Sequence, residues 1–241
     1  MKKAVMALAL AFFLAPASHA GTKKEVNILW VVDNSGSGAG RYLPRKLKEG
    51  FVHFSKILKT PYTMSVVTTD YFNDAGALVT SPSGLRVVSS QSKDPIGDFA
   101  ALVDSIQDSP TSFWEQGLES AYAALNAPHP QFLTPGAKLY VIYVSDEDDY
   151  SCADHCSGVQ PEDNADWVQY PTARYRKQLA ALGASSFALV GTPDSSCKVA
   201  SIGYRYATVQ PTGGIGFGSS ICEPEIVKSL IEFAIAIQAH N

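Results

Sequence analysis

Two continuous runs of apolar residues constrain the fold of this chain most strongly. The first, residues 28–32, ends at Asp33, and the second, within residues 138–144, is followed by Ser145 and Asp146. Strands inside a parallel sheet are buried on both faces, so they lack the polar alternation of a surface strand. Each run therefore predicts a buried strand. Each would deliver an Asp at its carboxyl end, which is the edge where open α/β sheets bind ligands.

The segments between these runs show helical and strand patterns in alternation. Apolar residues recur in steps of four, four, three and four at Leu43, Leu47, Phe51, Phe54 and Leu58, which predicts a helix over residues 41–59. Similar patterns predict helices at 96–106, from about 114, at 170–182 and at 224–238, and strands at 62–69, 85–89, 186–190 and within the glycine-rich segment 212–218. The alternation predicts an α/β fold with a mostly parallel sheet. The strands at 62–69 and 85–89 are expected to form a hairpin at its edge.

The first 20 residues have the composition of a secretory signal peptide. Lys2 and Lys3 precede an apolar stretch over residues 4–14, and Ser18-His19-Ala20 provides a cleavage site between small residues. We expect cleavage near Ala20 and export to the periplasm or the medium. The remaining chain has no apolar run of roughly 18 residues, so we expect no membrane span. Because no composition break divides residues 24–241, we expect one domain there.

The charge of the exported part argues against a nucleic-acid partner. Removal of Lys2 and Lys3 reduces the 19 basic residues to 17, against 23 acidic residues, so the net charge is −6. Phosphate contacts require clustered Lys and Arg, which this chain lacks. Four acids cluster at residues 146–149, and we expect Asp148 and Asp149 to be solvated loop acids. Glu115 is expected at the start of a helix, where the helix dipole favours an acid.

Four cysteines indicate disulfide bonds in an exported protein. They are Cys152, Cys156, Cys197 and Cys222, which allow three connectivities. We favour Cys152–Cys156 and Cys197–Cys222, because each pair falls within one region of the predicted fold. The first pair lies in a polar, acidic insertion at about 147–166. A zinc site there is the alternative, but the paired Cys-x-x-Cys sets of structural zinc sites are absent.

The stretch after the first apolar run carries oxygen ligands at alternate positions. Asp33, Ser35 and Ser37 can converge on one point from a single loop, and the intervening glycines allow the tight curvature that this requires. Carboxylate and hydroxyl oxygens are the ligands that a hard divalent cation prefers. Asp146 is expected on the same edge of the sheet. These residues therefore predict a divalent-cation site.

Together, these features resemble a von Willebrand factor type A (vWA) domain with a metal-ion-dependent adhesion site (MIDAS), of the type found in bacterial exported proteins. The resemblance rests on Asp33-x-Ser35-x-Ser37 after the first strand, on Ser145-Asp146 after the fourth, and on Thr-Gly-Gly at 212–214 before the last helix. It implies a doubly wound, six-stranded, Rossmann-like sheet in the order 3-2-1-4-5-6, with helices on both faces.

The resemblance also implies a set of metal ligands. The implied ion is Mg²⁺, with Mn²⁺ or Ca²⁺ as alternatives, and a fifth ligand comes from a loop before the helix that starts near Glu115. In this chain Ser112 takes that position, and its neighbour Thr111 is the alternative. The implied ligands are Asp33, Ser35, Ser37, Asp146 and either Ser112 or Thr111.

The expected function is binding rather than catalysis. A metal held by two carboxylates and neutral hydroxyls keeps its attraction for an acidic group of a protein ligand, or of another envelope or surface ligand. No Gly-x-Ser-x-Gly elbow surrounds Ser37, and the site offers no obvious nucleophile or general base, so we expect no enzyme. We expect a monomer. The alternative is a structural or assembly factor of the cell envelope whose metal site is vestigial or only stabilising.

Overall fold

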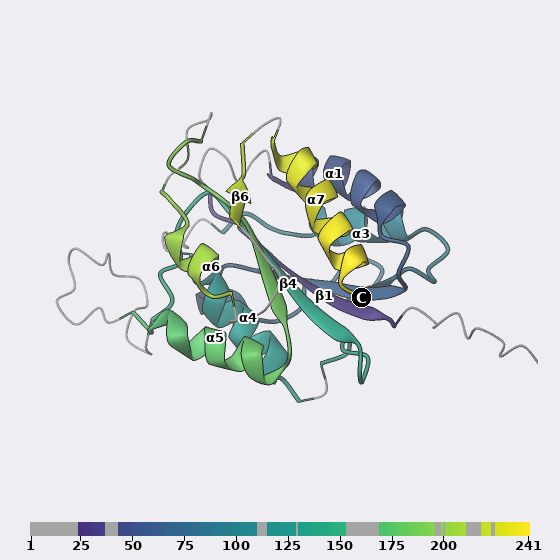
Figure 1. Cartoon of the computed structure of the whole chain (residues 1–241), viewed down its shortest axis with the longest axis horizontal. Coiled ribbons are helices and arrows are strands. Elements are labelled where there is room, and N and C mark those ends of the chain that lie inside the picture. Colours follow the sequence, from purple (N-terminus) through teal and green to yellow (C-terminus); the bar gives the residue numbers. More distant parts are fainter. Residues whose placement is uncertain are drawn as a thin grey trace, which may run out of the picture.

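The fold is a single six-stranded sheet with helices on both faces (Figure 1). The computed structural model describes residues 24–36, 43–109, 115–128, 130–152, 169–195, 199, 201–210, 218–222 and 225–241. The strand order is β3-β2-β1-β4-β5-β6. The strands are β1 (Val26–Val32), β2 (Tyr62–Thr68), β3 (Val88–Ser89), β4 (Lys138–Ser145), β5 (Ser185–Val190) and β6 (Gly218–Ser220).

The two apolar runs form the centre of the sheet. Strand β1 pairs in parallel with β2 on one side and with β4 on the other, and all seven of its residues are buried. Val32 lies opposite Thr68 and Val144, so the three strands end at nearly the same level. The short β3 is the only antiparallel strand among those described, and it lies at the edge as predicted.

The helices form two layers that enclose separate apolar clusters. On one face, Trp30 of the sheet packs against Phe51, Phe54 and Phe99, with its ring centroid 5.5 Å from that of Phe54. On the other face, Tyr143 of the sheet packs against Tyr206. Figure 1 shows α1, α3 and α7 on the first side and α4, α5 and α6 on the second. The helices are α1 (Leu43–Ile57), α2 (Tyr71–Asp74), α3 (Pro95–Val103), α4 (Gly117–Asn126), α5 (Thr172–Ala181), α6 (Tyr204–Thr208) and α7 (Glu225–Ala239).

The predicted fold class and strand order are confirmed, and the differences are local. Helix α4 begins at Gly117 rather than near residue 114, α5 begins at Thr172 rather than 170, and the short helices α2 and α6 were not predicted. None of the helices within the described ranges has the length and apolar composition that crossing a membrane requires. The predicted signal peptide, most of the 147–166 insertion and the Thr-Gly-Gly segment lie outside the described residues.

Candidate functional site

Three neighbouring parallel strands each end in a buried aspartate. Asp33 follows β1, Asp70 follows β2 by two residues, and Asp146 follows β4. Their residues are only 1%, 2% and 2% exposed. Because β2, β1 and β4 end at nearly the same level, the three carboxylates lie along the carboxyl edge of the sheet. The sequence prediction named Asp33 and Asp146 as ligands but missed Asp70, although Asp70 directly follows the strand predicted at 62–69.

Asp33 is fixed by contacts with its own loop and with the end of β4. Its Oδ1 accepts a hydrogen bond of 2.8 Å from the backbone N of Ser35, and its Oδ2 accepts one of 2.7 Å from Oγ of Ser145. Its own backbone N donates to the carbonyl of Val144 at 2.9 Å. Each carboxylate oxygen has a further lone pair, so these bonds orient the group without using all of its acceptor capacity.

The hydroxyl of Ser109 connects the Asp33 loop to Asp70. Ser35 and Ser109 form an isolated parallel bridge, and the N of Ser109 donates to the carbonyl of Asn34 at 2.8 Å. The Oγ of Ser109 donates to Oδ2 of Asp70 at 2.6 Å. Residues 33–35 and 109 therefore form one packed unit at this edge. Sequence reasoning did not find Ser109, because no local pattern links it to Ser35, which lies 74 residues earlier.

Two further acids lie close to these aspartates. Glu115 is fully buried; burial raises its pKa well above the usual range, and the negative charges of Asp33, Glu147, Asp70 and Asp146 raise it further. Burial, followed by the charges of Asp33 and Asp146, raises the pKa of Glu147 to about 7. The expectation that Glu115 begins a helix is wrong, since α4 starts two residues later. The site therefore concentrates five carboxyl groups.

This concentration of carboxyl groups makes the carboxyl edge of the sheet strongly negative. Mutual repulsion between buried carboxylates is relieved when a cation binds among them. Beside Asp33, the N of Thr69 donates to the carbonyl of Val32 at 3.1 Å, and the buried Oγ1 of Thr69 has no hydrogen-bond partner. Such an oxygen is stabilised by a bound cation or by a bound group with which it forms a hydrogen bond. Of the predicted ligands, the structure brings Asp33, Ser35 and Asp146 to this edge.

Metal binding by any of the predicted ligands stays a prediction, and three of the ligands are not placed. Ser37, Thr111 and Ser112 lie outside the described residues. Among the residues that are described, no group of three or more His, Cys, Asp and Glu side chains is arranged to hold a metal ion. The predicted set has a different composition, since it combines two carboxylates with hydroxyl groups.

Comparison with known proteins gives matches in structure but not in sequence. No protein-family model matches the chain, and no curated protein does. A solved structure of von Willebrand factor type A from Catenulispora acidiphila matches with a TM-score of 0.53 at 14% identity, over 90% of this chain and 42% of that chain. The pilus adhesin SpaC from Lactobacillus rhamnosus GG gives a TM-score of 0.52 at 13% identity, over 90% and 31%.

A third match is proximal thread matrix protein 1 from the mussel byssus, in a structure with a zinc-occupied MIDAS motif. It gives a TM-score of 0.52 at 12% identity, over 88% of this chain and 46% of that chain. This chain has a vWA-like fold. It spans less than half the length of each of the three matched chains.

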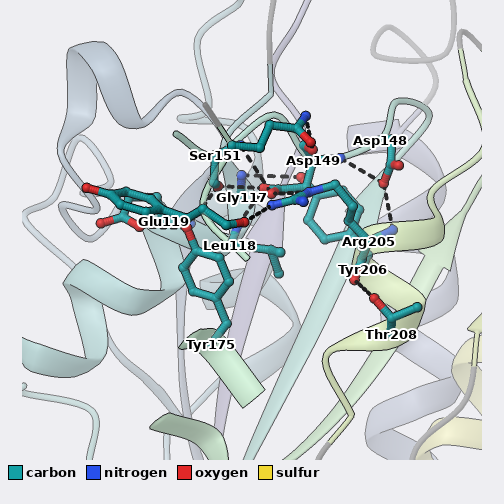
Figure 2. Close-up of polar contacts among 12 residues, drawn as sticks. Gly117, Leu118, Glu119, Asp148, Asp149, Ser151, Tyr175, Arg205, Tyr206 and Thr208 are labelled. Carbon is teal, nitrogen blue, oxygen red and sulfur yellow. Dashed lines mark hydrogen bonds and ion pairs between the residues drawn. The ribbon is translucent and has the colours of Figure 1, made fainter. Parts of the chain in front are cut away.

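The acidic loop after β4 of this vWA-like domain is anchored rather than solvated (Figure 2). Asp149 is fully buried, and Asp148 is half-buried. Oδ2 of Asp149 accepts from Nε of Arg205 at 3.1 Å, and its Oδ1 accepts from the N of Leu118 at 2.9 Å and from Oγ of Ser151 at 2.7 Å. The prediction of a solvated acid is therefore wrong for Asp149, because its cationic partner comes from α6, 56 residues away in the sequence.

Burial dominates the chemistry of Asp149 even with this partner. Burial raises its pKa to about 6, and Arg205 and the hydrogen bonds from Ser151 and Leu118 reduce the shift. Arg205 also donates to the carbonyl of Tyr170 at 2.7 Å. The network thus ties the loop after β4 to the start of α4, to α6 and to the segment before α5.

The same network extends along α4 of the vWA-like domain. Oγ of Ser151 accepts from the N of Glu119 at 2.9 Å. The Glu119 carboxylate accepts from Arg174 at 3.0 Å and from the hydroxyl of Tyr175 at 2.8 Å, and Figure 2 shows Tyr175 directed at it. The Arg174 guanidinium lies over the ring of Tyr170, 3.9 Å from its centroid. These contacts fix the loop that carries Asp146.

The cysteines of the described part are Cys152 and Cys222. Both are buried, and neither is a free thiol. Their favoured partners, Cys156 and Cys197, lie outside the described residues, so the pairing stays a prediction.

Proposed function

We propose that this vWA-like domain is an exported binding module that captures an acidic group of a protein or surface ligand through a divalent cation. Asp33, Ser35 and Asp146 would hold the cation, together with Ser37 and with Thr111 or Ser112. The bound cation would supply positive charge to an incoming carboxylate. The proposal includes no catalytic activity, and export would follow from cleavage of the signal peptide near Ala20.

One observation carries the proposal: the chain buries carboxylates together at the edge where vWA-like sheets present their loops. Asp33 and Asp146 are nearly inaccessible, and both raise the pKa of Glu147. Buried charges that are close together destabilise a fold unless an opposite charge accompanies them. The SpaC structure, described as a pilus adhesin, supports an adhesive role for this fold, and the byssus protein, by its own description, carries zinc in such a motif.

Thermal unfolding of the mature protein with Mg²⁺, Mn²⁺ or Ca²⁺ after treatment with EDTA tests the site. At a metal concentration 100 times Kd, binding adds about 2.7 kcal/mol to the free energy of unfolding. For a domain of this size that corresponds to a rise in Tm of about 5–10 °C. Asp33→Asn should abolish the rise, whereas Asp194→Asn, in an exposed turn after β5, should keep it. Equal melting of the wild type with each metal and with EDTA would refute the site.

Ligand capture separates the binding module from the alternative, an envelope assembly factor with a purely stabilising metal. The mature protein is used to capture ligands from envelope extract with Mg²⁺ or with EDTA. A binding module loses its ligand in EDTA and on Asp33→Asn, because the cation bridges the two partners. An assembly factor retains its partner under both conditions, provided that the protein remains folded.

A further inference from the structure

A cavity of about 480 Å³ lies beside the candidate metal site. It is formed by the end of β2, the short helix α2 with the segment that follows it, and the segment after α3. Asn34, from the loop that carries Asp33 and Ser35, also lines it. The volume is in the range of pockets that bind small organic groups. None of the proposed metal ligands lines this cavity, although Asp70 belongs both to its lining and to the five carboxyl groups at this edge.

Three carboxylates line the cavity, and no Lys, Arg or His of the described residues forms an ion pair with them. They belong to Asp70, Asp74 and Asp108. The described lining residues include no Lys, Arg or His. Asp70 accepts hydrogen bonds from Ser109 and Asn73, and Asp74 accepts one from Thr68. These are neutral donors, so the negative charge of the lining is not compensated.

A buried carbonyl oxygen supplies a second and independent indication of a ligand. Asn34 is 6% exposed, and its Nδ2 donates to the carbonyl of Gln107 at 3.1 Å. This bond fixes the orientation of the amide. The Oδ1 atom on the other side of the amide is buried and has no hydrogen-bond partner. An orphaned acceptor costs about 1–3 kcal/mol, so a donor that reaches it is stabilised.

The size and lining of the cavity indicate an organic cation rather than a metal ion. No group of three acidic, His or Cys side chains within the described chain could hold a metal, so the three carboxylates do not converge on one ion. Leu78, Val79 and Ile106 add apolar surface to the lining. Such a lining suits a cationic group on an aliphatic stem.

We propose that this cavity binds the side chain of an arginine from a protein partner. A guanidinium offers five N–H donors in a planar fork, and an ammonium offers three donors on a point charge. The amide of Asn34 and the carboxylates of Asp70, Asp74 and Asp108 come from three separate segments of the lining, which suits the broader group. The inference rests on the proposed function in that it assigns a basic residue to the same partner, near its acidic group.

The test uses the mature protein in EDTA, so that its result does not depend on the metal site. N-acetyl-arginine amide is titrated into ¹⁵N-labelled protein, and amide shifts are followed by NMR. We expect saturable shifts at lining residues such as Asn73, Gln107 and Ser109. The citrulline analogue, which has the same shape without the charge, should bind at least tenfold more weakly. Shifts elsewhere only, or equal binding of the citrulline or lysine analogue, would overturn the assignment.

Matched variants test the carboxylates directly. Asp108→Asn removes an exposed acid of the lining, and Asp194→Asn removes an exposed acid elsewhere, with the same change in net charge. Because one exposed ion pair contributes up to about 1 kcal/mol, Asp108→Asn should weaken arginine binding by up to about fivefold. Adding Asp74→Asn should weaken it further. An Asp108→Asn protein that binds as well as Asp194→Asn would contradict the proposal, whatever the outcome of the metal titration.

Discussion

Replacement of Arg205 by Met should leave a fully buried carboxylate without its cation. Asp149 is 0% exposed at its side chain, and Arg205 is the residue that pairs with it, at 3.1 Å. Breaking a buried pair by removing one partner costs about 3–5 kcal/mol. Asp149 would keep three hydrogen bonds, from Leu118 and Ser151, so we expect the lower limit, about 3 kcal/mol. With a urea m value of about 3 kcal/mol/M, this loss should lower the urea concentration at the midpoint of unfolding by about 1 M.

The pH dependence of this loss identifies its cause. In the folded protein the pKa of Asp149 is raised from 3.8 to about 6, so the folded state binds the proton more tightly than the unfolded state. The cost of burying the charge is therefore absent below pH 3.8 and fully present above pH 6. Without Arg205 the pKa rises further. The loss on Arg205→Met should then be about 3 kcal/mol at pH 8 and fall to about 1 kcal/mol, the value of an ordinary hydrogen bond, at pH 4.5.

Urea unfolding of both proteins at pH 4.5 and pH 8, followed by circular dichroism, measures the two values. Arg176→Met, on the exposed side of α5, makes the same side-chain change without a buried partner and should cost less than about 0.5 kcal/mol. An Arg205→Met loss of equal size at both pH values would refute the reasoning, because it would indicate lost packing and the lost bond to Tyr170 rather than a buried charge.

Three further changes test other parts of the structure by urea or thermal unfolding. Trp30→Ala should lower the free energy of unfolding by about 3–5 kcal/mol. Trp30→Phe should lower it by less than half as much, because the indole N–H has no hydrogen-bond partner among the described residues that could be lost. Equal losses for the two variants would contradict this. Gly117→Ala should lower the free energy of unfolding by about 1–3 kcal/mol, since the new Cβ would lie 2.6 Å from the Tyr206 hydroxyl oxygen. Gly218→Ala should leave it nearly unchanged, because the nearest atom to that Cβ would be 3.5 Å away. Glu115→Gln in EDTA should raise Tm at pH 8 but not at pH 4. The pKa of Glu115 is raised in the folded protein, so its carboxyl group destabilises the fold only where the unfolded chain carries the ionised form. An increase of equal size at both pH values would exclude the charge as the cause.

The fold was predictable because its signals are local and repeated. The five apolar residues that define the first helix are all buried in the core against β1. The run at 28–32 is inaccessible on both faces because helices cover both sides of the sheet. In contrast, α6 has five residues, too few for a hydrophobic period, and its existence depends on tertiary contacts such as that between Tyr206 and Tyr143.

The site was predictable only in part, for a related reason. Asp33 and Asp146 were found because each follows a strand that the sequence marks clearly. Asp70 follows a strand by the same rule and was overlooked. The burial of Glu115 and the pairing of Asp149 with Arg205 were outside the reach of local patterns, since the residues that surround them come from distant segments.

The treatment of charge differs between the two sides of the carboxyl edge, and this difference bears on function. On the side of α4 and α6, the protein neutralises Asp149 with its own Arg205. On the side of β1 and β2, Asp33 and Asp70 are just as inaccessible, yet among the described residues each accepts hydrogen bonds only from neutral donors. A carboxylate that is buried without an opposite charge costs stability. The two proposals above rest on this negative charge at the loops of a vWA-like sheet, which would attract a metal ion at Asp33 and a basic side chain at Asp70.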